Sequence, residues 1–141
     1  MNSKYSLTPE AGLYRITALR DVGRMVTTGD RGGLIASEKN LTVSGDAWVY
    51  GDARVYGDAE IFSAGHILWL TIPWTWSVTV YRTTKGHLIQ AGCQRFTIDQ
   101  VDAIASEHAS SDPRVLAMLP GFIAMIGTFV DSWHKDTGVR R

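Results

Sequence analysis

Several residue types that would mark a particular class of protein are scarce in this sequence. The single cysteine, Cys93, cannot form an internal disulfide, which is typical of a protein from a reducing compartment. The longest uncharged run, residues 115–130, contains Pro120 and two glycines and is shorter than a bilayer span requires. The first residues also lack the apolar stretch of a secretory signal. We therefore expect a cytoplasmic protein without a membrane segment.

Net charge is absent as well, although the charges are unevenly distributed. Fourteen basic and fourteen acidic residues cancel, so no overall field favours nucleic acid or an anionic membrane. No acidic residue lies between Glu60 and Asp99. The basic residues and histidines of that segment are Arg82, Lys85, Arg95, His66 and His87. Two interpretations stay open: this basic segment pairs with the acidic segment after Asp99, or it forms an anion site.

The strongest pattern is a hexad of the form Val-x-Gly-Asp-Ala-x, written three times over residues 43–60. Such a repeat is typical of a β-helix, in which short strands wind into a coil and Gly-Asp pairs turn the corners. The residues expected to point inward are Val43, Val49, Val55, Ile61, Ile67, Ala47, Ala53 and Ala59. The residues expected to point outward are Trp48, Tyr50, Arg54, Tyr56 and Glu60. The repeated Asp46, Asp52 and Asp58 suggest acceptors of backbone hydrogen bonds more than calcium ligands.

The segments around the hexads show weaker but readable signals. Residues 13–19 alternate like a strand, and the glycine-rich residues 29–33 indicate a tight turn. Residues 67–72, 76–82 and 88–91 read as strands, with a hairpin loop at 83–86. Thr97 and Gln100 form a capping box that opens a helix over about residues 98–109, and Asp112-Pro113 opens another. Pro120 should kink this last helix.

Together these patterns predict a mainly β protein with C-terminal helices, an α+β arrangement in one structural domain. Its parts are the N-terminal strands with the hexapeptide-repeat β-helix coil (1–66), a small antiparallel sheet (67–96), a two-helix oligomerisation segment (97–134) and a flexible tail (135–141). Three hexads make about one turn of coil, whose ends need covering. The apolar stripe of the last helix is too wide for one packing partner. We therefore expect a homo-oligomer with interface candidates Phe122, Ile126, Phe129 and Trp133.

The basic segment also contains the candidate ligand site. A hairpin tip that carries Arg and Lys, next to a capped helix N-terminus, favours phosphate or carboxylate. A tyrosine or tryptophan nearby would cover a planar ring. The candidate ligand-binding residues are Arg82, Lys85, His87, Arg95, Tyr81 and Trp76.

No motif for catalysis or metal binding has comparable strength. His66 would be the general base of a hexapeptide-repeat transferase, but a single coil does not form the cofactor slot. Cys93 with His87 or His108 carries no local signature of a nucleophile and its base. The four histidines are widely spaced, and no paired Cys/His motif indicates a metal site. We expect a non-enzymatic protein with no metal and no cofactor.

The hexads and their flanks resemble a group of bacteriophage and prophage hexapeptide-repeat proteins of the "VYGDAR" type. The resemblance covers roughly residues 13–108. It rests on LYRITAL at 13–19, GDRGG at 29–33, SEKNL at 37–41, the hexads, YRT at 81–83, Gly86, Gly92-Cys93, Thr97 and His108. This chain departs from the pattern in its short repeat tract and in Phe96, where a small residue is usual.

The resemblance implies a phage-encoded protein that acts by binding in the host cytoplasm. The leading hypothesis is an oligomeric anti-defence protein that sequesters a nucleotide-type signal or another anionic ligand. The alternatives are a direct protein-binding inhibitor of a host defence complex, similar to anti-CRISPR proteins, a virion structural or assembly protein, and a hexapeptide-repeat transferase. Its partners would be a second copy of the chain and either a small nucleotide or a host defence protein. Neither a membrane nor a nucleic acid is expected.

Overall fold

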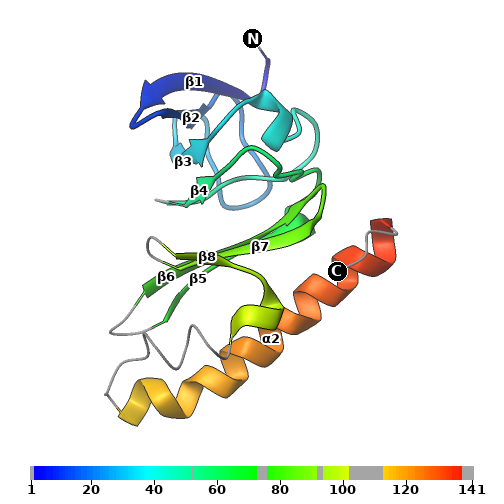
Figure 1. Cartoon of the computed structure of the whole chain (residues 1–141). Coiled ribbons are helices and arrows are strands. Elements are labelled where there is room, and N and C mark those ends of the chain that lie inside the picture. Colours follow the sequence, from blue (N-terminus) through cyan, green and yellow to red (C-terminus); the bar gives the residue numbers. More distant parts are fainter. Residues whose placement is uncertain (1, 52, 73–75, 92–93, 102–112, 138–141) are drawn as a thin grey trace.

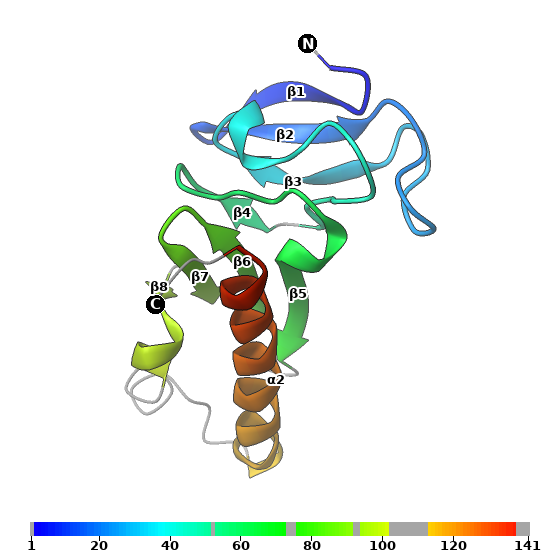
Figure 2. The same ribbon diagram turned by 90° about the vertical axis from the view of Figure 1, so that its right-hand side faces the viewer.

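The computed structural model describes residues 2–51, 53–72, 76–91, 94–101 and 113–137, and it places two four-stranded sheets beside one long helix (Figure 1). The first sheet has the order β1 (Tyr5–Glu10), β2 (Leu13–Ala18), β3 (Arg31–Ile35), β4 (Arg54–Val55). The second has the order β5 (Ile67–Ile72), β6 (Trp76–Thr83), β7 (Gly86–Ala91), β8 (Gln94–Phe96). The helices are η1 (Glu38–Asn40), η2 (Ala64–His66), η3 (Ile98–Gln100) and α2 (Pro113–Thr137). The second sheet lies between the first sheet and α2 (Figures 1 and 2).

The β-helix prediction is wrong. The hexads contribute only the short strand β4, which pairs in parallel with β3, and otherwise form turns and irregular chain. An isolated parallel bridge joins Leu41 to Ile61, after which the chain enters the antiparallel second sheet. The three hexads run along the edge of the first sheet only once. The other three strands of that sheet, β1–β3, are antiparallel and come from outside the repeat. No second coil is left for the repeat to stack on.

The burial pattern of the hexads nevertheless follows their six-residue period. The expected inward residues that are buried are Ala47, Val49, Ala53, Val55, Ala59, Ile61 and Ile67. Val43 is exposed instead. Trp48, expected on the outside, is 2% exposed and meets the Tyr5 ring edge-on at 6.5 Å. The reason is that β1–β3 cover the side of the hexads on which Trp48 lies.

The expected turn at residues 29–33 is only partly correct. Gly29 has a φ of +93° and makes the turn, but Gly32 and Gly33 lie inside β3. A Cβ on Gly33 would come within 2.6 Å of the Ala53 carbonyl oxygen. This glycine is therefore explained by the close approach of the hexad segment to β3.

The second sheet agrees with the sequence more closely. Strands expected at residues 67–72, 76–82 and 88–91 are confirmed as β5, β6 and β7, and antiparallel pairing runs through all four strands. One face packs on α2 and forms a core of Val78, Val80, Ile89, Ala91, Phe96, Ile126, Val130 and Trp133. The apolar stripe of α2 thus has a partner within the same chain.

The prediction of two C-terminal helices is wrong for the part of the chain that is described, which contains the single α-helix α2. The capping box of Thr97 and Gln100 is confirmed, with the Thr97 N–H donating to the Gln100 side chain at 2.9 Å. It opens the short turn η3, and residues 102–112 of the expected first helix lie outside the described residues. Pro120 lies inside α2, and the helix continues beyond it to Thr137.

Two buried polar side chains hold the hexad segment to the first sheet. Asn40 is fully buried, and its Nδ2 donates to the carbonyls of Tyr56, Gly57 and Ala59 at 3.0–3.3 Å. Its Oδ1 accepts the N–H groups of residues 36 and 37 at 2.9 Å. Lys4 is also fully buried, and its Nζ donates to two carbonyls at the start of the first hexad, those of residues 42 and 44.

Replacing Asn40 by Ala should lower the free energy of unfolding by about 3 kcal/mol or more, because several buried backbone groups lose their partner at once. Urea denaturation followed by circular dichroism measures this. Asn2→Ala is the matched control, since the Asn2 side chain also accepts two backbone N–H groups but is only half-buried. Equal losses in the two variants would contradict the role given to Asn40.

Lys4 makes stability depend on pH, because burial and the nearby Arg20 lower its pKa to about 8. Between pH 8 and the ordinary lysine pKa, the unfolded chain binds more protons than the folded chain, so stability rises with pH. We expect a gain of about 2 kcal/mol from pH 8 to pH 10, since one pKa unit corresponds to about 1.4 kcal/mol. Urea titrations at both pH values should show this gain in the natural protein and not in Lys4→Met.

Candidate functional site

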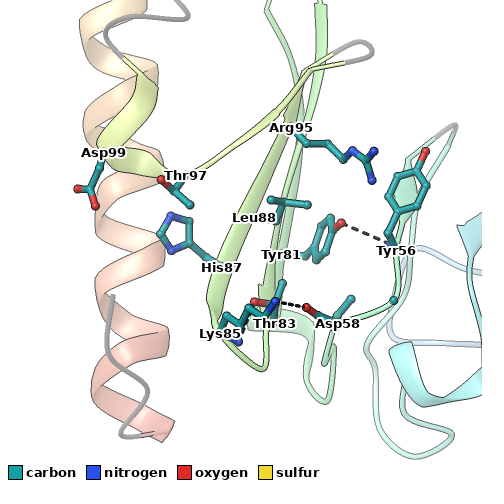
Figure 3. Close-up of a pocket in the computed structure, with 12 residues that line it drawn as sticks. Tyr56, Asp58, Tyr81, Thr83, Lys85, His87, Leu88, Arg95, Thr97 and Asp99 are labelled. Atoms are coloured by element: carbon teal, nitrogen blue, oxygen red, sulfur yellow. Dashed lines mark hydrogen bonds and ion pairs between the residues drawn. The ribbon is translucent and has the colours of Figure 1, made fainter.

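A pocket of about 430 Å³ lies where the last hexad meets the second sheet (Figure 3). Its lining consists of Tyr56, Gly57, Asp58, Ala59, Tyr81, Thr83, Lys85, His87, Leu88, Arg95, Thr97 and Asp99. An isolated bridge between Ala59 and Thr83 joins the two sides, and the Thr84 N–H donates to the Asp58 carbonyl at 2.9 Å. The pocket is therefore built from chain segments that are distant in sequence and held together by backbone hydrogen bonds.

Aromatic rings and a guanidinium group form one wall of this pocket. Tyr81 belongs to β6 of the second sheet, but its side chain packs in the core of the first sheet and is only 1% exposed. Its Oη accepts the Tyr56 N–H at 3.4 Å. The Arg95 guanidinium carbon lies 4.4 Å from the centroid of the Tyr56 ring (Figure 3). Among the described residues no carboxylate forms an ion pair with Arg95. Its N–H groups are therefore available at the edge of a stacked, planar cation.

The opposite wall carries an ion pair in contact with water. Lys85 Nζ lies 3.3 Å from Asp58 Oδ2, and the two side chains are 84% and 56% exposed. Exposed pairs of this kind contribute about 0–1 kcal/mol. An incoming anion would therefore displace Asp58 from Lys85 at small cost.

The pocket ends at η3, which His87 anchors. His87 is buried, and its Nε2 accepts the Ile98 N–H at 2.9 Å. This hydrogen bond requires an unprotonated Nε2 and fixes the position of Thr97 and Asp99 at the end of the pocket. With Asp58 and Asp99 beside Lys85 and Arg95, the formal charges of the lining cancel.

The structure brings four of the six predicted ligand residues into this pocket: Tyr81, Lys85, His87 and Arg95. Arg82 does not line it. Its guanidinium is buried over the Phe62 ring, and its Nε donates to the Glu60 carbonyl at 3.0 Å, so it braces the hexad segment against β6. The Trp76 side chain lies outside the described residues. Of the expected helix, the described residues include the turn η3 and Val101, and three residues of η3 alone do not make an anion site; residues 102–112 lie outside the described part.

Sequence reasoning missed the contribution of the last hexad to the pocket. Tyr56 and Asp58 were predicted as an outward residue and a turn residue, and neither was expected beside Arg95 or Lys85. The available signal was the outward position of Tyr56, because an aromatic residue on the outer face of a repeat needs a partner. The partner itself depends on pairing across more than twenty residues and leaves no local pattern.

The remaining sequence candidates lie elsewhere. His66 is in η2, where its Nδ1 accepts the Phe62 N–H at 3.1 Å, and it does not line the pocket. Cys93 and His108 lie outside the described residues. Within the described ranges, no three His, Cys, Asp or Glu side chains are grouped closely enough to hold a metal ion. No described backbone N–H donates to the side chain of Asp46 or Asp58, contrary to expectation, and Asp52 is outside the described part.

The four interface candidates on α2 lie against the second sheet. Ile126 and Trp133 are buried in the core that α2 shares with the second sheet, and Phe122 and Phe129 pack partly buried against that core. The Trp133 indole N–H donates to the Gly65 carbonyl, which ties the end of α2 to η2. Homo-oligomerisation through these residues stays a prediction, and each of the four already contacts its own chain.

No family model matches the sequence, and comparisons with curated proteins and with solved structures gave no match either. The phage resemblance therefore stays a prediction from the motifs. Searching the described helices for a segment that is both long enough and apolar enough to cross a membrane finds none.

Burial raises the pKa of Tyr81 and of Tyr5 to about 12, whereas a tyrosine in water ionises near pH 10. A folded-state pKa above the unfolded value means that stability is lost as pH rises from about 10 to 12. Absorbance at 295 nm should show at least two of the five tyrosines ionising near pH 12. Tyr81→Phe should remove one of these late transitions. Ionisation of Tyr81 near pH 10 in the folded protein would contradict its buried position.

Proposed function

We propose that this protein is a non-enzymatic binding protein whose pocket takes a small anionic ligand with a planar ring, of the nucleotide class. The observation that carries the proposal is Arg95, stacked on Tyr56 and without a described carboxylate partner, in a pocket of about 430 Å³. Pockets for small molecules and cofactors have volumes of about 300–1,000 Å³. The dimensions and the chemistry therefore suit one nucleotide-sized ligand.

Arg95 and Lys85 supply the contacts for an anionic group. A guanidinium presents parallel N–H donors that match two oxygens of a phosphate, and stacking on Tyr56 restricts its orientation beforehand. Lys85 adds a second positive charge when it leaves Asp58. Arg95 should therefore contribute more to the affinity for an anion than Lys85, which must first leave Asp58.

The rest of the lining favours a nucleotide over a simple anion. Asp58 and Asp99 repel an ion such as inorganic phosphate, but they accept hydrogen bonds from sugar hydroxyls or amino groups on a ring. Tyr56 and Leu88 offer apolar surface for the ring itself, and stacking of this type tolerates different bases. A ligand that carries donors next to its phosphate satisfies both sets of charges.

Sequestration, rather than turnover, is the proposed outcome of binding. His87 has its Nε2 occupied by the Ile98 N–H, and Lys85 is paired with Asp58, so neither is poised as a general base. Given the resemblance to phage proteins, the proposed ligand is a nucleotide signal of host defence, held in the host cytoplasm. Occupation of a host protein is the competing outcome, and the absence of any small ligand on the purified protein would favour it.

The first test is native mass spectrometry of protein purified gently from expressing cells, followed by calorimetry with mononucleotides and cyclic dinucleotides. Arg95→Ala should weaken nucleotide binding at least tenfold, because a charge-assisted contact contributes about 1.5–3 kcal/mol. Lys85→Ala should weaken it about two- to fivefold. Arg54→Ala is the matched control, because Arg54 is exposed on β4 and does not line the pocket.

Two results would overturn this proposal. One is that no nucleotide binds to the natural protein at millimolar concentration. The other is that Arg95→Ala and Arg54→Ala bind a nucleotide with the same affinity as the natural protein. Equal binding of inorganic phosphate and of a nucleotide would remove the role given to the two carboxylates.

A further inference from the structure

A second cavity, here called the aromatic pocket, has a volume of about 310 Å³. It is lined by Met25, Asp46, Trp48, Tyr50, Ala64, Ile67, Leu68 and Trp69. It shares no residue with the pocket around Arg95 and is built mainly from the first two hexads and β5, whereas the pocket around Arg95 is built mainly from the last hexad and β6–β8. The two pockets are therefore separate sites.

The hexads position the two pockets at opposite ends of one row across the second sheet. Strand register pairs Trp69 with Thr79, Thr79 with Gln90, and Gln90 with Arg95. Tyr50 lies over Trp69 at one end, and Tyr56 lies over Arg95 at the other. Both tyrosines hold the same position in successive hexads, so each end of the row receives one aromatic ring from the repeat.

The aromatic pocket leaves large apolar side chains in contact with water. Trp69 is 42% exposed and Met25 is 79% exposed. The Tyr50 and Trp69 rings are nearly parallel, at 16°, with centroids 6.4 Å apart. Gly51, with a φ of +55°, lies directly under Trp69, because a Cβ there would come within 2.8 Å of the indole. The indole is thus held in place at the surface by backbone packing.

Asp46 gives this pocket its charge. It is the one charged residue among the described lining residues, and no described group forms a hydrogen bond or ion pair with its carboxylate. Two cations lie in its neighbourhood, but both are engaged elsewhere. Lys4 donates to the carbonyls of residues 42 and 44, and Arg20 donates to those of residues 21 and 45. Neither lines the pocket, so the Asp46 carboxylate is the one charged group among the described lining residues, and it lies beside aromatic faces.

We propose that the aromatic pocket binds a small organic cation, an ammonium or guanidinium group carried on an apolar body. Tryptophan and tyrosine faces attract such cations through the ring quadrupole, by about 0.5–1 kcal/mol at exposed sites. The Asp46 carboxylate adds an ion pair, and the apolar lining takes the rest of the ligand. The same carboxylate repels an anion, so this site has the opposite charge preference to the pocket around Arg95. The proposal does not depend on nucleotide binding there.

The test uses three probes with a closely similar aromatic body and different charge: 2-phenylethylammonium, 2-phenylethanol and 3-phenylpropionate. Binding is followed by the indole N–H signals in ¹⁵N NMR spectra, with Trp69→Phe to assign the responding indole. The ammonium should bind about five- to tenfold more tightly than the alcohol, and the carboxylate should bind most weakly.

Asp46→Asn is the decisive variant, since Asp46 is exposed and its carboxylate forms no described hydrogen bond or ion pair on which the fold depends. It should reduce the affinity for the ammonium to that of the alcohol and leave the alcohol unaffected. Asp58→Asn, at the same hexad position in the other pocket, is the matched control and should change neither. Equal affinities for all three probes, no binding of the ammonium at millimolar concentration, or an unchanged ammonium affinity in Asp46→Asn would each overturn the proposal.

Discussion

The hydrogen bonds of the Asn40 side chain are the constraint on which the rest of this structure depends. The hexads do not continue into a ladder of strands, so the carbonyls of the last hexad need another partner inside the protein. Asn40 supplies it by donating to the carbonyls of residues 56, 57 and 59 while its own oxygen binds the chain before η1. These carbonyls belong to the same residues that form a wall of the pocket around Arg95. One buried amide thereby links the fold of the first sheet to the shape of the candidate site.

The contact between the two sheets is made through the hexad repeat. Tyr81 extends from the second sheet into the first core, and the Ala59–Thr83 bridge continues that contact through the backbone. Tyr50 and Tyr56 then meet opposite ends of a single cross-strand row, at Trp69 and Arg95. A six-residue period that failed to produce a β-helix thus still determines where two pockets lie.

The two pockets show how a chain of zero net charge can offer selective sites. At one, a stacked arginine forms no ion pair with a described carboxylate, and at the other an aspartate forms no ion pair with a described cation, so each pocket presents a charged group that the overall composition conceals. Both charges lie next to aromatic rings, which restrict the orientation of a ligand and exclude water from one face. We infer that recognition by this protein depends on these local pairs of charge and ring.

The amino-acid sequence was sufficient for features that depend on near neighbours. It predicted β5, β6 and β7, the capping box at Thr97 and the burial of most hexad valines and alanines, because periodicity reports which side chains face a core. It did not predict what each buried side chain packs against. The parallel partner of β4, the burial of Trp48, the bracing role of Arg82 and the meeting of Tyr56 with Arg95 all arise from pairings between distant segments. Such pairings are selected by the packing of the whole chain, for which a local pattern carries no signal.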